Sequence, residues 1–311
     1  MKKLIKMAIA YDFDGTLAPG NMQEHSFIPD VATTTKKFWK EVKKFSKVHE
    51  MDEVSAYMHL MIEKANRANK SITRKSFKER GKTIKLFVGV DTWFKRINEY
   101  AKTKGVTIEH FIISSGLKEM IEGTKIGKKF KHIFASNFMY LSEAPKWPAI
   151  SVNYTTKTQY LFRINKGIFN CYDNEKINKF TPDEDRYIPF LNMIYIGDGE
   201  TDIPCMKIVK QQGGHSIAVY NPDKRNQKTN NAKLIKDNRA DWLVSANYSE
   251  RSDMDELVKD IICKIAIENK LRCKRAEIIK MVNKKRDVSK KGNKNHKTII
   301  TQSENQAEIK Q

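Results

Sequence analysis

Short apolar runs alternate along the chain with longer segments whose apolar residues recur at helical spacing. Six runs have the length and β-branched content of buried strands: Leu4–Tyr11, Thr107–Ile113, His132–Ala135, Asn192–Ile196, Ser216–Tyr220 and Asp241–Val244. Helical segments separate most of these runs. The pattern therefore predicts an α/β fold with a doubly wound, Rossmann-like parallel sheet.

A long helical segment interrupts this alternation directly after the first strand. Its apolar stripes follow the helical period: Phe38, Val42 and Phe45; Val54, Tyr57, Met58, Met61 and Ile62; Trp93, Ile97 and Tyr100. We therefore expect a helical cap over residues 21–104 and a core formed by residues 1–20 and 105–263. Within the core, Phe138–Tyr154 predicts a small hairpin or flap, and residues 168–190 an irregular polar insertion.

The last part of the chain changes in character. Met254–Ile279 is apolar at helical spacing, which predicts one or two closing helices. Lys284–Gln311 is polar, basic and aperiodic, so we expect residues 264–311 to form a C-terminal helix followed by a disordered basic tail.

Charge is distributed unevenly over the 311 residues. Of the formal net charge of +21, about +11 lies in residues 36–105 and about +9 in 264–311. Two explanations remain open: lysine on every solvated face, as in a Lys- and Asn-rich proteome, or a basic surface for nucleic acid or another polyanion.

Several classes of protein are not expected. No apolar run approaches the roughly 20 residues of a membrane span, and Asp12 and Asp14 interrupt the apolar N-terminus before it resembles a secretion signal. We therefore expect a cytoplasmic protein without membrane contact. The four cysteines are scattered, which indicates free thiols and not disulfides or zinc ligands.

Two carboxylates follow the first strand. The motif Asp12-Phe-Asp14-Gly15-Thr16-Leu17 places them two positions apart at a strand's carboxyl end, the edge where open α/β sheets bind ligands. Asp-Gly is also an ordinary turn dipeptide. The interpretation therefore depends on partners elsewhere in the chain.

Two candidate partners follow other strands. Ser114-Ser115-Gly116 joins a strand to a helix, where a hydroxyl and backbone N–H groups bind phosphate oxygens, although a serine there is also an ordinary helix cap. Lys157 opens a helical segment, but a single lysine in so basic a chain carries little information.

A second acidic motif completes the set. Gly197-Asp198-Gly199-Glu200-Thr201-Asp202 ends another apolar strand, and Asp202 falls in the first turn of the next helix. Carboxylates gathered from strand ends form an all-oxygen site that suits Mg²⁺. Two carboxylates about 4 Å apart repel by roughly 4 kcal/mol at an effective dielectric near 20, so a cation is needed to hold them together.

These four motifs, in this order, resemble those of the haloacid dehalogenase superfamily of aspartate-nucleophile phosphohydrolases. The layout of Ser-Ser-Gly before a helix, Phe-Ala-Ser-Asn before a hairpin and then the lysine helix is most similar to the phosphoserine-phosphatase-like branch. The insertion between Asp14 and Ser114 is larger than in that branch, and the stretch 168–190 is extra. Both departures concern the substrate and not the chemical core.

The resemblance implies a role for each motif. Asp12 would attack phosphorus, and Asp14 would act as general acid and then as base for water. Lys157 would offset negative charge, and Ser114 with the backbone of Ser115 and Gly116 would hold phosphate oxygens.

The resemblance also implies a metal site. Mg²⁺ would be bound by the carboxylates of Asp12 and Asp198 and by the main-chain carbonyl of Asp14, with Asp202 acting through water.

These roles predict a Mg²⁺-dependent phosphomonoesterase that forms an aspartyl-phosphate and acts on a small phosphorylated metabolite. One alternative is a phosphatase of nucleic-acid ends or of a phosphoprotein held by the basic cap and tail. Another is a non-catalytic nucleic-acid-binding protein. If the cap supplies basic contacts to substrate, the candidates are Arg67, Arg74, Arg80 and Lys82.

Overall fold

The computed structural model describes residues 4–307, with side chains as far as residue 282. The chain divides into two units, Met1–Ile262 and Cys263–Gln311, and one helix, α12 (Asp253–Ala307), runs through both. No helix among the described residues is long and apolar enough to cross a membrane.

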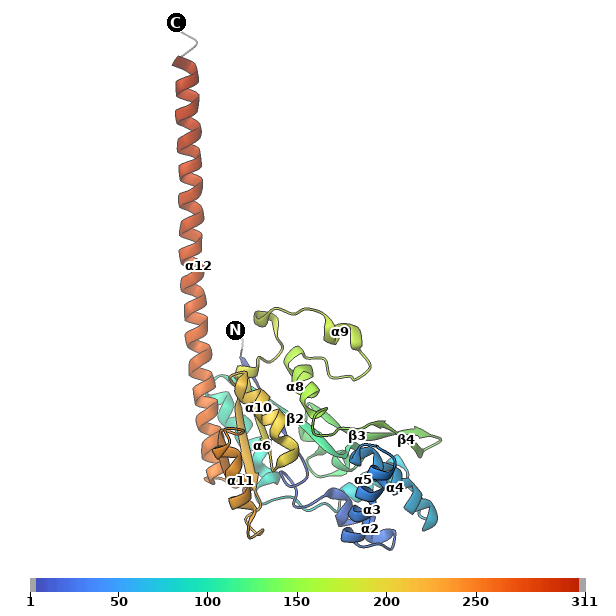
Figure 1. The fold of residues 1–311 in the computed structure, drawn as a ribbon. Helices are drawn as coiled ribbons and strands as arrows, with labels where there is room; N and C mark the ends of the chain where they lie inside the picture. The colour runs from blue at the N-terminus through green and yellow to red at the C-terminus, as the bar shows by residue number, and fades with distance from the viewer. Residues whose placement is uncertain (1–3, 308–311) are drawn as a thin grey trace. The chain divides into compact units, whose positions relative to one another are not determined.

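A seven-stranded sheet forms the centre of the first unit (Figure 1). The strands are β1 (Ile5–Tyr11), β2 (Val106–Leu117), β3 (His132–Leu141), β4 (Ala144–Ile150), β5 (Met193–Gly197), β6 (His215–Tyr220) and β7 (Trp242–Ser245). Their order is β4-β3-β2-β1-β5-β6-β7, and every neighbouring pair is parallel except the β3–β4 hairpin. The predicted doubly wound parallel sheet and the hairpin are both confirmed.

Helices pack on both faces of the sheet. The described helices are α1 (Met22–His25), α2 (Phe27–Asp30), α3 (Thr35–Val48), α4 (Glu53–Arg67), α5 (Arg74–Gly81), α6 (Val90–Thr103), α7 (Lys118–Gly123), α8 (Lys157–Lys166), α9 (Asn174–Asn178), α10 (Ile203–Gln211), α11 (Gln227–Lys236) and α12. Ala8 and Ala10 of β1 face the core formed with α8 and α10. Tyr11, one position on, contacts α6, because side chains alternate between the faces of a strand.

The helical insertion between β1 and β2 contains α1–α5, which group beside the β3–β4 hairpin in Figure 1. Its α5 packs on α7 where a Cβ at Gly81 or Gly123 would collide with the facing backbone, so the two helices approach closely. The predicted cap extends to residue 104, but α6 packs against β2 and β1 as a layer of the sheet domain.

Two segments differ from the sequence prediction. The strand expected over Thr107–Ile113 continues as β2 to Leu117, with irregular pairing to β3 between Ser114 and Leu117. The backbone from Lys284 to Ala307, expected to be disordered, continues helix α12. That stretch contains no proline and is rich in lysine, so local propensity permits a helix where apolar periodicity does not predict one.

Hydrogen bonds to Asp52 link the insertion to the segment before α8. Its carboxylate caps α4 by accepting a hydrogen bond from the backbone of Val54 at 2.8 Å. It also accepts hydrogen bonds from Ser151 Oγ at 3.1 Å and Asn153 Nδ2 at 2.9 Å. One side chain therefore sets both the start of α4 and its position next to the residues that precede Lys157.

Asp52→Ala should lower the free energy of unfolding by about 2–3 kcal/mol, because it removes the cap and leaves Asn153 and Ser151 without their acceptor. Thr34→Ala, which removes an exposed cap of α3 that accepts only from Lys37, should lose only about 1 kcal/mol. Urea unfolding of both variants tests this difference. Equal losses would show that the contacts to Ser151 and Asn153 contribute nothing.

A buried polar chain holds α6 on the sheet. Trp93 Nε1 donates to Tyr11 Oη at 2.9 Å, and Tyr11 lies 3.0 Å from His110 Nδ1. Because the Tyr11 oxygen accepts from Trp93, its hydroxyl is free to donate to Nδ1. The other ring nitrogen, Nε2, then carries the proton and donates to Asn98 Oδ1 at 3.0 Å. This arrangement requires a neutral imidazole.

Burial lowers the pKa of His110 from 6.5 to about 3. The unfolded chain therefore binds a proton that the folded chain excludes, so the stability from this site is complete above pH 6.5 and is lost as the pH falls. Between about pH 7.5 and about pH 5, the wild type should lose about 2 kcal/mol more unfolding free energy than His110→Gln. Parallel pH dependences in denaturant titrations would contradict this.

Candidate active site

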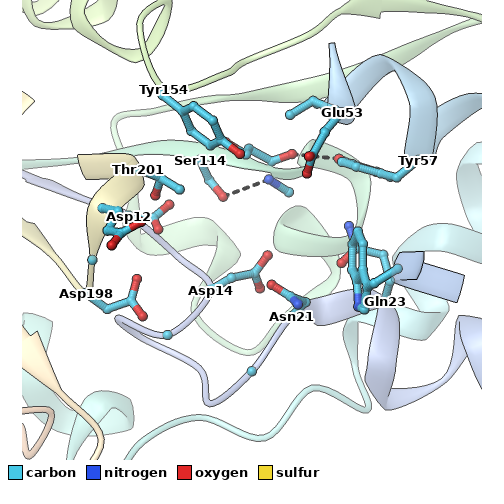
Figure 2. A pocket seen from close by; sticks show the side chains of 18 of the residues that line it. Asp12, Asp14, Asn21, Gln23, Glu53, Tyr57, Ser114, Tyr154, Asp198 and Thr201 are labelled. Carbon is cyan, nitrogen blue, oxygen red and sulfur yellow. Dashed lines mark hydrogen bonds between the residues drawn. The ribbon is translucent and has the colours of Figure 1, made fainter. Parts of the chain in front are cut away.

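A cavity of about 420 Å³ opens at the carboxyl ends of β1, β2 and β5. Figure 2 shows acidic side chains of the sheet domain on one side of it and residues of the insertion on the other. The lining residues from the sheet domain are Asp12, Asp14, Gly15, Ser114, Ser115, Gly116, Tyr154, Lys157, Asp198, Gly199, Glu200, Thr201 and Lys224. Those from the insertion are Gly20, Asn21, Gln23, Glu24, Trp39, Glu53, Val54 and Tyr57.

Lys157 lies between two carboxylates. It is the first residue of α8 and is 1% exposed, and its Nζ lies 3.0 Å from Asp12 Oδ1 and 2.7 Å from Asp202 Oδ1. Burial alone lowers the pKa of Lys157, but Asp12 and Asp202 more than offset this and hold it above its ordinary value. The lysine is therefore a fixed positive charge at the end of β1.

Asp202 is held from three directions. Its Oδ1 also accepts from Tyr195 Oη at 2.6 Å, and its Oδ2 accepts from the backbone of Asp198 at 3.2 Å. Gly197 makes this approach feasible, because a Cβ there would collide with the Asp202 side chain. Asp202 thus positions Lys157 and the loop that carries Asp198.

Asp14 has a different environment from Asp12. Its Oδ1 accepts a hydrogen bond from the backbone of Met22 at 2.9 Å, and a Cβ at Gly116 would crowd its Oδ2. Burial and then the charge of Asp12 raise the pKa of Asp14 well above 3.8. Asp14 can therefore carry a proton in the same cavity in which Asp12 contacts a lysine.

Asp198 projects toward Gly15, the residue after Asp14. Gly15 has a φ of +77°, and a Cβ on it would collide with the Asp198 carboxylate. Asn231 Nδ2 donates to the main-chain oxygen of Asp198 at 2.7 Å, and Gln227 Nε2 lies 3.4 Å from its Oδ2. The loop after β5 is thus fixed to α11.

The clustered acids raise one another's pKa. Burial, with Asp202 as the next cause, raises the pKa of Asp12 to about 6 although Lys157 lowers it. The same two causes raise the pKa of Asp198 to about 8. One oxygen each of Asp12, Asp198 and Asp202 lies within 4.8 Å of the others, which is a donor set that could hold a cation.

The serine motif lies at the same edge. Ser114 is fully buried and its Oγ accepts from the backbone of Gly116 at 3.0 Å, while Ser115 Oγ is buried without a hydrogen-bond partner among the described residues. Tyr57 of the insertion donates its hydroxyl to the main-chain oxygen of Ser115 at 2.6 Å (Figure 2). Every motif named from the sequence thus reaches this cavity or its wall.

Some functional neighbours carry no clear sequence signal. Tyr195 follows the apolar pattern of a strand, so its hydrogen bond to Asp202 cannot be read from that pattern. Asn231 lies in a polar helix that gives no reason to single it out. Tyr57 belongs to a predicted apolar stripe, but its hydroxyl reaches the serine loop.

The basic side chains suggested as substrate contacts lie elsewhere. Arg67 pairs with Glu63 of its own helix, Lys82, which directly follows α5, pairs with Glu79, and Arg80 pairs with Asp30 of α2. Arg74 lies 3.8 Å from Glu119 and stacks on Tyr140. None of the described lysines or arginines of the insertion lines the cavity.

Comparisons with known proteins agree with this architecture. The family model for haloacid dehalogenase-like hydrolases matches residues 9–207. An uncharacterized protein of Borreliella burgdorferi is 29% identical over 285 residues, which cover 83% of this chain and 96% of the relative.

Solved structures share the fold at low identity. A haloacid dehalogenase-family hydrolase of Salmonella enterica serovar Typhi has a TM-score of 0.51 at 15% identity, covering 83% of this chain and 72% of its own. A probable phosphoserine phosphatase of Vibrio cholerae has a TM-score of 0.51 at 14% identity. The match covers 87% of this chain and 69% of the Vibrio chain.

A phosphoserine phosphatase solved with an analogue of its phospho-aspartyl intermediate has a TM-score of 0.50 at 17% identity, covering 82% of this chain and 98% of its own. The family match includes both acidic motifs, Ser114 and Lys157, which the fold brings together around one cavity. The chain belongs to the haloacid dehalogenase-like hydrolase family.

Proposed function

We propose that this protein is a Mg²⁺-dependent phosphomonoesterase that works through an aspartyl-phosphate on Asp12. The observation that carries the proposal is the contrast between the two acids of the first motif. Asp12 contacts Lys157 at 3.0 Å, whereas Asp14 is held by a backbone N–H at 2.9 Å. Burial raises the pKa of both carboxyls, but Lys157 contacts only Asp12. One carboxylate is thus kept as an anion and its neighbour as a proton carrier, as nucleophilic attack on a phosphate ester requires.

The donor set suits Mg²⁺. Asp12, Asp198 and Asp202 offer only oxygen, and burial, followed by the repulsion of Asp202, raises the pKa values of Asp12 and Asp198. Both oxygens of Asp202 already accept hydrogen bonds. The protein ligands of Mg²⁺ would therefore be the carboxylates of Asp12 and Asp198 and the main-chain carbonyl of Asp14. When bound, Mg²⁺ would neutralise phosphate charge.

The remaining roles belong to the chain itself. An Asp12 oxygen forms a bond to phosphorus as the bond to the ester oxygen breaks, and Asp14 gives its proton to the departing oxygen. Asp14 then accepts a proton from the water that breaks the aspartyl–phosphorus bond. In this proposal Lys157 stabilises charge on the transferring group, and Ser114 and Ser115, which line the cavity, bind its oxygens.

Structural relatives support this chemistry. Proteins of the same fold include phosphoserine phosphatases, one of them solved with an analogue of a phospho-aspartyl intermediate. We carry phosphate-ester hydrolysis over to this chain because its two acids, lysine and serines occupy one cavity.

Asp12→Asn should lower kcat for an aryl phosphate by at least about 10³-fold, because the amide is a poor nucleophile. Asp91→Asn, an exposed change on α6 outside the cavity, serves as the matched control and should retain wild-type turnover. Steady-state kinetics with circular dichroism of each variant gives the measurement. Substantial activity in a folded Asp12→Asn variant would show that Asp12 is not the nucleophile.

Removal of divalent metal should abolish turnover, and added Mg²⁺ should restore it. Mg²⁺ should also raise the melting temperature of the metal-free protein, because it binds only the folded state. This increase should be smaller in Asp198→Asn and preserved in Asp91→Asn. Full turnover after dialysis against a chelator, or an equal thermal shift in Asp198→Asn, would refute the proposed metal site.

A further inference from the structure

The wall that the insertion contributes to the cavity is acidic and aromatic. Among the described residues it contains Glu24, Glu53, Trp39 and Tyr57, and the sheet domain adds the ring of Tyr154. Figure 2 shows Glu53, Tyr57 and Tyr154 together on the side of the cavity away from Asp198. The part of a substrate that lies beyond its phosphate would meet this wall.

Glu53 is the free charge of this wall. It is exposed at the first position of α4, and no hydrogen bond or ion pair links its carboxylate to another described side chain. Burial and then the charge of Glu53 raise the pKa of Tyr154, whose ring lies on the same side of the cavity (Figure 2). Glu24, by contrast, accepts hydrogen bonds from Trp39 Nε1 and Asn21 Nδ2, both at 2.8 Å.

A second observation points to a hydrogen-bond donor in the substrate. Gln23 is 2% exposed and lines the cavity, and its Oε1 has no hydrogen-bond partner among the described residues. A buried acceptor without a donor is unfavourable by about 1–3 kcal/mol, so a donor from a bound molecule would stabilise it. An ammonium group would supply both a positive charge to pair with the Glu53 carboxylate and an N–H to donate to Gln23 Oε1.

Among the described residues, the same wall offers no positively charged side chain to an anionic group. No described lysine or arginine of the insertion lines the cavity. Lys157 is already paired with Asp12 and Asp202, and Lys224 is close enough to Asp198 to lower the pKa of that carboxyl. A carboxylate on the substrate would therefore face Glu53 without a cation to hold it.

We propose that the substrate is a phosphate monoester of an amino alcohol without a carboxylate, with its ammonium group held by Glu53, Gln23 and the rings of Tyr57 and Tyr154. Carboxylates, amide oxygens and aromatic faces are the groups that recognise alkylammonium ions. This inference rests on the proposed phosphomonoesterase activity and names the substrate class for the same cavity.

The first test compares isosteric substrates on the full-length protein with Mg²⁺. 2-Aminoethyl phosphate and propyl phosphate differ mainly in an ammonium group replacing a methyl group. The ammonium compound should have a kcat/KM at least about tenfold higher, as expected for one charge-assisted contact. Phosphoserine, which adds a carboxylate, should fall below 2-aminoethyl phosphate. Phosphocholine, which has the positive charge but no N–H for Gln23, should also fall below 2-aminoethyl phosphate.

The second test locates the contact. Glu53→Gln should reduce the kcat/KM ratio of 2-aminoethyl to propyl phosphate by about tenfold. Glu79→Gln, an exposed change in α5 outside the cavity, should leave the ratio unchanged. Equal rates on the isosteric pair, a preference for phosphoserine, or a ratio unaffected by Glu53→Gln would each overturn the proposal.

Binding separates this inference from the catalytic one. Calorimetry on Asp12→Asn with Mg²⁺ measures the affinity for the same two esters without turnover. Tighter binding of 2-aminoethyl phosphate with no hydrolysis by the wild type would refute the phosphatase function and retain the ammonium site. Hydrolysis of propyl phosphate with equal binding of both esters would retain the phosphatase and refute the ammonium site.

Discussion

The crowding of carboxylates at the ends of β1 and β5 is the constraint on which the rest of the site depends. Asp12, Asp14, Asp198 and Asp202 share one edge, and Lys157 is the buried cation that contacts two of them. Removing one partner of a buried pair typically destabilises a protein by about 3–5 kcal/mol. The position of α8, which begins at Lys157, is therefore tied electrostatically to β1 and to the loop after β5.

Close packing of these acids explains which backbone positions lack a side chain. Gly15 adopts a left-handed conformation beneath the Asp198 carboxylate, and Gly197 makes room for Asp202. Gly116 leaves space beside Asp14 Oδ2. Each of these three glycines lies where a Cβ would displace an acid or its neighbour, so these three follow from the close packing of the carboxylates. The turn-forming tendency of Asp-Gly is a secondary consequence.

Most of the sheet could be predicted from the sequence because buried parallel strands are continuous apolar runs bounded by polar ends. The acids after β1 and β5 could be found because they break such runs abruptly. The hydrogen bond from Tyr195 to Asp202 could not, since a tyrosine in a core strand has the same pattern whether or not its hydroxyl has a partner. The role of α6 was also hidden, because a stripe containing Trp93 indicates a helix without indicating which surface it covers.

The same limit applies to charge, and here it matters for function. The insertion carries much of the chain's positive excess, yet none of its described lysines or arginines lines the cavity, and several of them pair with acids elsewhere. Its cavity wall instead carries Glu53 and Glu24. Net charge is a sum over a whole segment. The electrostatic field on a bound ligand, by contrast, comes mainly from the few charged groups that face it within about a Debye length. A basic segment can therefore present an acidic wall. Because the end of the cavity proposed to bind phosphate already has Lys157 and a donor set suited to Mg²⁺, the uncompensated charge at the other end is the negative charge of Glu53. That polarity favours a molecule that is anionic at one end and cationic at the other.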